Sequence, residues 1–214
     1  MYIPAAFNET DLNKLFEFIE QHSFGILVSQ HGGAPFASHL PFLTDRNAGP
    51  KGQLIGHMAR ANPHWTQAEG QSVVCVFSGP HAYISPTWYE AANAVPTWNY
   101  AAVHVTGKFQ AIHDPEELLH ILTRTVNVYE SRQAVPWQFD TSNEFYKKLA
   151  LSIVGFRIQI DNIEGKWKLN QNRPLEQREK VVRALQQSAS PDDLAIAEMM
   201  KLNILANNAA RDSA

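Results

Sequence analysis

The first half of the chain is a series of short apolar runs separated by polar turns. Apolar residues between Leu12 and Ile19 recur mostly at intervals of three and four, which predicts an amphipathic helix with one apolar face. The run at 24–30 predicts a buried strand, and the turn at 31–33 leads into a returning strand at 34–44. We therefore expect a helix followed by a β-hairpin.

Three further strands are predicted before the pattern changes. They cover 53–58, 71–78 and the segment from Thr97 to Ile112. Between the first two, Asn62-Pro63 predicts the end of a strand and the start of a short helix, because proline is tolerated at a first helical position.

The second half of the chain is mainly helical. After Asp114 the apolar residues follow a 3.6-residue period. The remaining predicted elements are a helix at 143–151, a strand at 153–160, a turn at 162–165, and helices at 175–187 and 192–207. Short strands with interposed and appended helices favour an α+β fold that is mainly β: a small, antiparallel, Greek-key-like barrel with packing helices.

Composition narrows the class of protein. With 214 residues, 44% hydrophobic and 18% charged, the chain can bury one sizeable core. The first residues have neither a basic nor an apolar leader region, and no segment approaches a membrane span, so we expect a cytoplasmic protein without a membrane partner. A net charge of −3 argues against broad attraction to nucleic acid.

The single cysteine, Cys75, lies in an apolar run and is expected to be an inert core residue.

The stretch from Gly79 to His104 concentrates aromatic residues that carry polar atoms. A segment that only fills a core needs no ring nitrogen, N–H or O–H group, because such groups must be satisfied once buried. Tryptophan, tyrosine and histidine side chains in one short span suit a planar, partly polar ligand. Packing in the core or in a dimer is the alternative for each aromatic residue taken singly.

Metal and nucleophile motifs are missing from the sequence. The nine histidines form no HExxH pattern, and no CxxC occurs. Ser78-Gly79-Pro80-His81 lacks the GxSxG elbow of hydrolases. We therefore predict no metal site and no catalytic residues.

Several motifs together resemble the PaiB-type family of FMN-binding negative transcriptional regulators. The similarity runs in one order from residue 1 to about 173, which is most of the chain. The matching strings are MYIPAAF, HLPF, GHMARANPHW, FSGPHAYISPTWY, VPTWNYAAVHVTG, IVGFRIQI and GKWKLNQNR. The long strings around the two tryptophans are specific.

The resemblance implies a fold, a cofactor and a partner. It implies an FMN-binding split β-barrel over residues 1–173, usually a homodimer with the flavin at the subunit interface, and a role as a negative regulator. Residues 174–214 then form a C-terminal helical extension that packs on the barrel or the dimer. Two alternatives stay open: a flavin-dependent oxidoreductase of the pyridoxamine-phosphate-oxidase or flavin-reductase type, and a haem-handling protein of related fold, since fold does not decide function.

Candidate flavin contacts follow from the resemblance and from side-chain chemistry. Arg60 is the candidate for the phosphate, because a guanidinium group gives charge-assisted, fork-shaped contacts beside a helix start. Along the strand that contains Ser38, His39 and Leu40, side chains alternate, so these three cannot all face the ring. Trp98, Asn99 and Tyr100 are expected to stack on or cover the ring from the partner subunit. The remaining candidates are His57, Met58, Ala59, Asn62, Lys168, Gln171 and Asn172.

The last two predicted helices have the outline of a helix-turn-helix but not its charge. Basic and acidic residues are equal in number between residues 173 and 214. A recognition helix normally presents a basic face to phosphates, whereas the final helix carries mainly apolar residues around Lys201. We favour packing or dimerisation for this helix, with promoter DNA as a weaker prediction for a direct or indirect partner.

Overall fold

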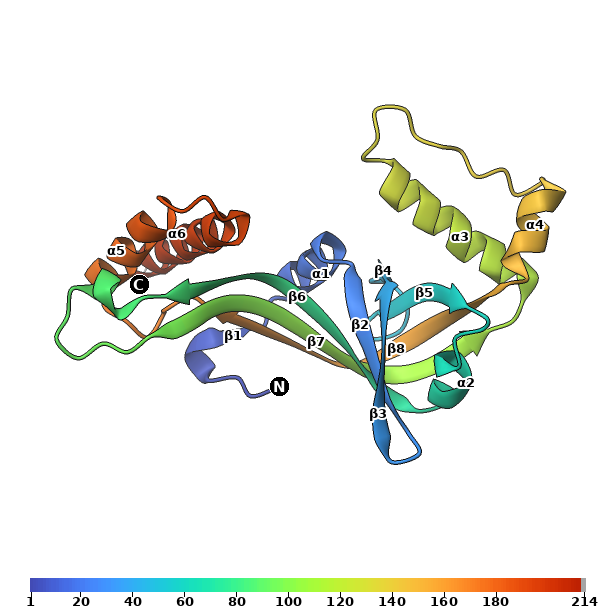
Figure 1. Cartoon of the computed structure of the whole chain (residues 1–214), viewed down its shortest axis with the longest axis horizontal. Coiled ribbons are helices and arrows are strands. Elements are labelled where there is room, and N and C mark those ends of the chain that lie inside the picture. The colour runs from blue at the N-terminus through green and yellow to red at the C-terminus, as the bar shows by residue number, and fades with distance from the viewer. Residues whose placement is uncertain (213–214) are drawn as a thin grey trace. The chain divides into compact units, whose positions relative to one another are not determined.

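The computed structural model describes residues 1–212, in which eight strands form one sheet (Figure 1). The strand order is β3-β2-β6-β7-β8-β5-β4, and β1 pairs with β8. The strands are β1 (Asn8–Glu9), β2 (Phe24–His31), β3 (Ala34–Pro41), β4 (Leu43–Asp45), β5 (Gln53–Ala59), β6 (Ser72–Ile84), β7 (Thr97–Ile112) and β8 (Ile153–Lys168). The α-helices are α1 (Leu12–Gln21), α2 (His64–Ala68), α3 (Pro115–Glu130), α4 (Glu144–Ala150), α5 (Leu175–Leu185) and α6 (Pro191–Asp212), with 3-10 turns η1 (Ala5–Phe7) and η2 (Pro86–Tyr89).

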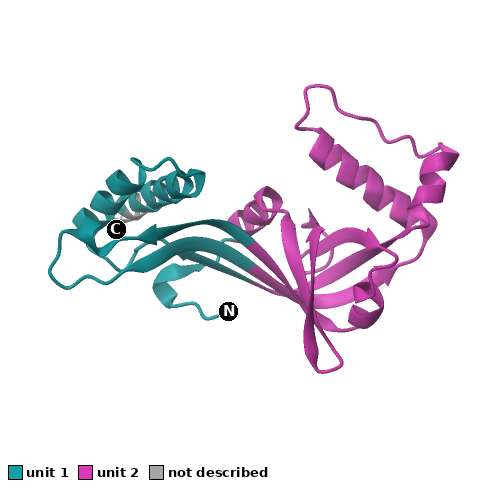
Figure 2. Ribbon diagram, in the orientation of Figure 1, with its two compact units in different colours: residues 1–11, 78–103, 164–214 teal, residues 12–77, 104–163 magenta. Residues whose placement is uncertain are grey.

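The chain forms two compact units, each assembled from segments that are distant in the sequence (Figure 2). Unit 1 comprises residues 1–11, 78–103 and 164–214, and unit 2 comprises residues 12–77 and 104–163. The long strands β6, β7 and β8 contribute residues to both units. The predicted domain boundary at residue 173 does not coincide with the boundary between these units. Helices α5 and α6 belong to unit 1 together with strand segments that come before residue 173. Residues 213–214 of the predicted extension lie outside the described residues.

Unit 2 contains the barrel. Its core is built around phenylalanine rings: Phe42 lies 5.3 Å from Phe77 and 5.7 Å from Phe156, measured between ring centroids. Phe109 stacks on Phe156 at 5.3 Å. Strand β3 also contacts β5, so the sheet curls back on itself. Buried aromatic and aliphatic side chains of this kind supply most of the favourable free energy of folding.

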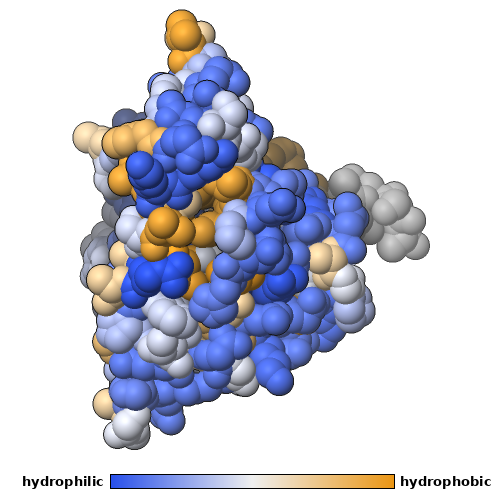
Figure 3. All heavy atoms as spheres, turned by 90° about the vertical axis from the view of Figure 1, so that its right-hand side faces the viewer, coloured by the Kyte–Doolittle hydropathy of each residue, from blue (hydrophilic) through white to orange (hydrophobic). Residues whose placement is uncertain are grey.

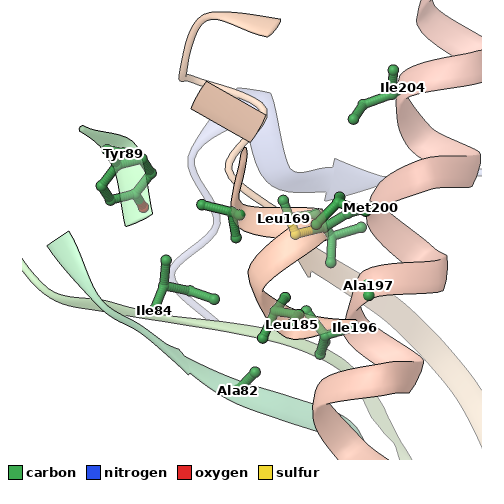
Figure 4. Packing of buried hydrophobic residues seen from close by; sticks show 11 residues of the cluster. Ala82, Ile84, Tyr89, Leu169, Leu185, Ile196, Ala197, Met200 and Ile204 are labelled. Carbon is green, nitrogen blue, oxygen red and sulfur yellow. The ribbon is translucent and has the colours of Figure 1, made fainter. Parts of the chain in front are cut away.

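Unit 1 has its own core, in which α5 and α6 cover one face of a strand segment (Figure 4). Ala82 and Ile84 of β6 and the residue after β8, Leu169, are all buried. They belong to one cluster with the helix residues Val181, Val182, Leu185, Ile196, Ala197, Met200 and Ile204. The expectation that the final helix has a packing face agrees with this cluster.

Two parts of the sequence prediction are wrong. The turn predicted at 162–165 does not exist, because β8 runs without a break to Lys168. Pairing of β1 with Gly165 and Lys166 holds this segment extended, and that partner is distant in sequence. Strand β6 likewise continues past its predicted end at residue 78 to Ile84, so the first part of the aromatic stretch belongs to this strand.

The prediction that the single cysteine is a core residue agrees with the structure. The Cys75 side chain is fully buried, and burial raises the pKa of its thiol. No helix within residues 1–212 is long and apolar enough to cross a membrane.

Candidate functional site

The predicted flavin contacts separate into two groups, one in each compact unit. Unit 2 holds those on β3, on β5 and in the loop before α2, and unit 1 holds those on β7, on β8 and in the turn before α5. The first group is Ser38, His39, Leu40, His57, Met58, Ala59, Arg60 and Asn62; the second is Trp98, Asn99, Tyr100, Lys168, Gln171 and Asn172.

In unit 2, a hydrogen-bond network joins the loop before α2 to strands β2 and β3. The Asn62 side-chain amide donates to Ser38 Oγ at 3.0 Å, and its oxygen accepts the His64 backbone N–H at 3.0 Å. His64 Nδ1 lies 2.8 Å from Ser38 Oγ, and Nε2 lies 2.9 Å from Ser29 Oγ. Each ring nitrogen of the fully buried His64 therefore has a hydroxyl partner. Asn62 and His64 fix the start of α2 against the hairpin.

The other predicted flavin contacts in unit 2 lie on opposite faces of their strands, because side chains alternate along a strand. Leu40 and Met58 are buried in the core, whereas His39 is exposed beside the Phe24 ring. His57 lies on the face of β5 that packs against α3, and its Nδ1 has no hydrogen-bond partner among the described residues. Burial lowers the pKa of His57. Contact with one ligand through all of these side chains is therefore excluded, as the alternation along β3 predicts.

Arg60 is held at the C-terminal end of α4. Its Nε donates to the Leu151 carbonyl at 2.8 Å, and its Nη2 donates to the Ile153 carbonyl at 2.9 Å. Carbonyl groups at a helix C-terminus attract a cation, so this position stabilises the guanidinium group. The described residues place no carboxylate within ion-pair distance of Arg60, and its remaining N–H donors can reach a ligand.

In unit 1, the face of the sheet opposite α5 and α6 carries aromatic rings and two lysines. We call it the aromatic–lysine face, after the side chains that point away from the helices. The Trp98 ring is half exposed, and its centroid lies 5.9 Å from the His81 ring and 5.9 Å from the Tyr83 ring. The members of the aromatic–lysine face are Tyr83, Trp98, Tyr100, Lys166 and Lys168. His81, beside Trp98, is not one of them, because its Nδ1 lies 3.4 Å from Asp192 Oδ2 of α6.

The two lysines of this face are partly or fully withdrawn from water. Lys166 is 8% exposed; its Nζ donates to the Tyr2 carbonyl at 3.0 Å and lies 5.2 Å from the Tyr100 ring centroid. Lys168 donates to Thr97 Oγ1. Burial, and then the neighbouring Lys166 charge, lower the pKa of Lys168. No carboxylate among residues 1–212 pairs with either ammonium group. Two uncompensated cations beside aromatic rings form a donor set that fits a phosphate dianion and a flat ring.

Three of the predicted flavin contacts in unit 1 do not lie on the aromatic–lysine face. Asn99 is fully buried beneath α6, where its amide lies 3.4 Å from Met200 Sδ and its oxygen has no partner among the described residues. Gln171 accepts the Leu169 N–H and donates to the Trp167 carbonyl, so its side chain shapes the turn after β8. Asn172 is exposed in the same turn.

Two residues of these sites were not predicted from the sequence. His64 completes the network around Ser38, and Lys166 forms the cation pair with Lys168. The i, i+2 spacing of Lys166 and Lys168 on a strand is the signal that places both on one face, but the predicted turn at 162–165 concealed it.

Stability is expected to fall in mild acid because two histidines are buried in neutral form. Burial lowers the pKa of His57 and His64 below the ordinary value of 6.5, so the unfolded chain binds more protons than the folded protein. The free energy of unfolding is therefore highest above pH 6.5 and falls as the pH drops below it. Urea unfolding at pH 7.5 and 5.5 measures this change.

The matched variants are His64→Gln and His31→Gln. The first removes one of the two buried groups and is expected to reduce the pH dependence, whereas the second alters an exposed histidine and should leave it as in the original protein. An identical acid loss in the His64→Gln protein would contradict the assignment.

The sequence is similar to a protein family and to a named bacterial protein. Residues 1–162 match a protein family described as "Putative FMN-binding domain". The Bacillus subtilis "Protease synthase and sporulation protein PAI 2" is 37% identical over 203 residues, which cover 94% of this chain and 97% of that protein.

Two solved structures share the fold. The flavocytochrome Anf3 from Azotobacter vinelandii superposes with a TM-score of 0.57 at 15% identity, covering 75% of this chain and 69% of that one. The FAD and heme binding protein from Mycobacterium smegmatis gives 0.58 at 14% identity, covering 75% and 73%. The prediction of an α+β split barrel is confirmed by this likeness.

Proposed function

The chain belongs to the FMN-binding domain family that its residues 1–162 match, and from this premise we propose that it is a homodimeric FMN-binding regulatory protein. The resemblance to PaiB-type proteins is confirmed by the 37% identity with the Bacillus subtilis relative. The observation that carries the proposal is the aromatic–lysine face, where two ammonium groups lie beside aromatic rings without a carboxylate partner.

We assign the flavin phosphate to Lys168 and Lys166. A dianion between them removes the repulsion that contributes to the lowered pKa of Lys168. Charge-assisted hydrogen bonds from ammonium groups that are already partly desolvated are stronger than those from fully hydrated ones.

The half-exposed Trp98 ring and the Tyr100 ring are the proposed stacking partners of the isoalloxazine ring. Asn99 and Gln171 support this surface from behind, since their side chains are engaged within unit 1. Asn172 remains a proposed polar contact at the edge of the face.

The unit 2 residues form a second proposed set of flavin contacts. Ser38, Asn62 and Arg60 offer a hydroxyl, an amide and a guanidinium group for the phosphate or the ribityl chain. Contacts from His39, His57, Leu40, Met58 and Ala59 remain proposals through backbone groups. In a homodimer the two sets can come from different subunits.

Bound FMN supplies a ring that accepts and releases electrons. The side chains described above bind and orient this ring and shield it from water; none of them is placed as a general acid or base. We propose that flavin occupancy or redox state biases a regulatory output, by analogy with the relative whose name refers to protease synthesis and sporulation.

An absorption spectrum of the purified protein, followed by FMN titration, tests this proposal. Saturable binding of one FMN per chain supports it, and the absence of binding at tens of micromolar FMN refutes it. Steady NAD(P)H oxidation by the loaded protein would instead indicate a flavin-dependent oxidoreductase. A Soret band would indicate the haem-handling alternative.

Direct DNA recognition by the final helix is not favoured by its charges. Lys201 pairs with Glu198 at 3.4 Å, and Leu202 and Leu205 of α6 are exposed. Lys180 pairs with both Glu90 and Glu176. We therefore propose that a promoter is regulated through another surface or another protein.

Lys201→Ala is expected to leave any binding of a promoter fragment within about twofold of the original, because one paired surface charge contributes little. Gel retardation at physiological salt measures the affinity. A loss greater than tenfold would show that α6 does contact DNA.

A further inference from the structure

A cavity separate from the aromatic–lysine face lies within unit 2, between α3, α4 and Arg60. Its volume is about 300 Å³. Figure 3 shows the same side of the molecule, where apolar side chains gather in a hollow bordered by polar ones. The lining residues that matter are Arg60, Leu118, Leu119, Lys148, Ala150 and Leu151.

The wall of this cavity is apolar. Leu118 of α3 and Ala150 of α4 are buried, Leu119 is half-buried, and Leu151 is 67% exposed. Leucine side chains that remain accessible around a concave surface favour a ligand with an apolar body, because covering them removes apolar area from water.

The rim of the cavity is positively charged. Of its charged residues, Lys147 pairs with Glu144 at 2.9 Å, so these two charges compensate one another. Lys148 and Arg60 have no carboxylate within ion-pair distance among the described residues. Two uncompensated cations at an apolar wall favour an anionic group on the ligand.

One of these cations is held in a fixed position. The bonds from Arg60 to the Leu151 and Ile153 carbonyls use two of its five N–H groups and orient the guanidinium plane. A pre-oriented guanidinium loses little side-chain entropy when it binds a carboxylate or sulfonate.

We propose that this cavity binds a small amphipathic organic acid, with its apolar body on Leu118, Leu119 and Leu151 and its acid group near Arg60 and Lys148. FMN fits this arrangement less well, because a hydroxylated ribityl chain separates its ring from its phosphate. Arg60 also belongs to the second proposed flavin set, so competition with FMN has to be measured. This inference rests on the proposed function: the flavin-binding regulator would have a second site, which binds a small-molecule effector.

Fluorescence titration with 8-anilinonaphthalene-1-sulfonate, an aryl sulfonate, tests the proposal on the full chain. We expect saturable binding of one probe per chain that octanoate displaces and octylamine does not. Lys148→Glu and Leu151→Glu are each expected to weaken binding of the probe about tenfold, because each puts a carboxylate beside the sulfonate or on the apolar wall. Both residues are exposed, so we expect the variants to fold. Lys108→Glu makes the same charge change at an exposed position outside the cavity and should have no effect.

Unchanged probe affinity in both cavity variants would overturn the proposal, and so would stoichiometric displacement of the probe by FMN. Displacement by octylamine as effective as that by octanoate would also contradict the anionic selectivity. FMN binding measured on the same proteins keeps the two proposals distinct. If the original protein binds FMN but shows no saturable probe binding, only the acid site is refuted; if it binds the probe but not FMN, only the flavin site is refuted.

Discussion

Lys168→Gln is expected to weaken FMN binding about tenfold to a hundredfold, which is the effect of removing one charge-assisted hydrogen bond. The Lys168 ammonium is partly buried beside Lys166 and has no carboxylate partner among the described residues. Glutamine keeps the length and a hydrogen-bond donor but removes the charge. Titration of flavin fluorescence at constant ionic strength measures the dissociation constant.

Lys201→Gln is the matched control. It makes the same charge change within unit 1 but on α6, which packs against the opposite face of the strand segment. It should leave FMN affinity within about twofold of the original. Equal affinities in the Lys168→Gln and original proteins would show that the phosphate lies elsewhere, with the Arg60 set as the next candidate.

Gly107→Ala is expected to destabilise the protein by about 3 kcal/mol, at the upper end for forcing extra volume into a packed core. A Cβ atom at Gly107 of β7 would lie 2.2 Å from the Gln159 carbonyl oxygen and 2.8 Å from Ile158 Cγ2 of β8. The obstructing atom is backbone in a neighbouring strand, so it cannot turn aside as a flexible side chain does. Urea unfolding measures the loss as a lower midpoint with an unchanged slope.

Gly32→Asn is the comparison for this change. Gly32 has a φ of 60° in the β2–β3 turn, and a Cβ there meets no atom within 4 Å. Asparagine tolerates left-handed backbone conformations, so the variant should lie within about 1 kcal/mol of the original. A Gly107→Ala protein as stable as Gly32→Asn would mean that β7 and β8 separate more easily than this packing implies.

The local pattern along the sequence was sufficient for most elements. The period of apolar residues located α1 and α3, and the Gly32-Gly33 turn located the β2–β3 hairpin. These features depend on neighbouring residues, since a helical face, a tight turn and strand alternation are all set within a few positions. The motifs also identified the family, which the similarity over residues 1–162 confirms.

The candidate site depended on tertiary structure. Strand β8 continues past residue 162 because β1, more than 150 residues earlier, pairs with it, and this pairing puts Lys166 and Lys168 on one face. Asn99 and Tyr100 are adjacent in sequence, yet one is buried under α6 and the other faces the lysines.

The family, the barrel class and the residue types available for a flavin can thus be predicted from the sequence alone. Which of these side chains keep an uncompensated charge at a surface, and which make internal contacts, follows from the tertiary fold. The physical reason is that burial and ion pairing arise between segments far apart in the chain. The cavity beside Arg60 is an example, since α3, α4 and Arg60, the residue after β5, each supply part of its wall.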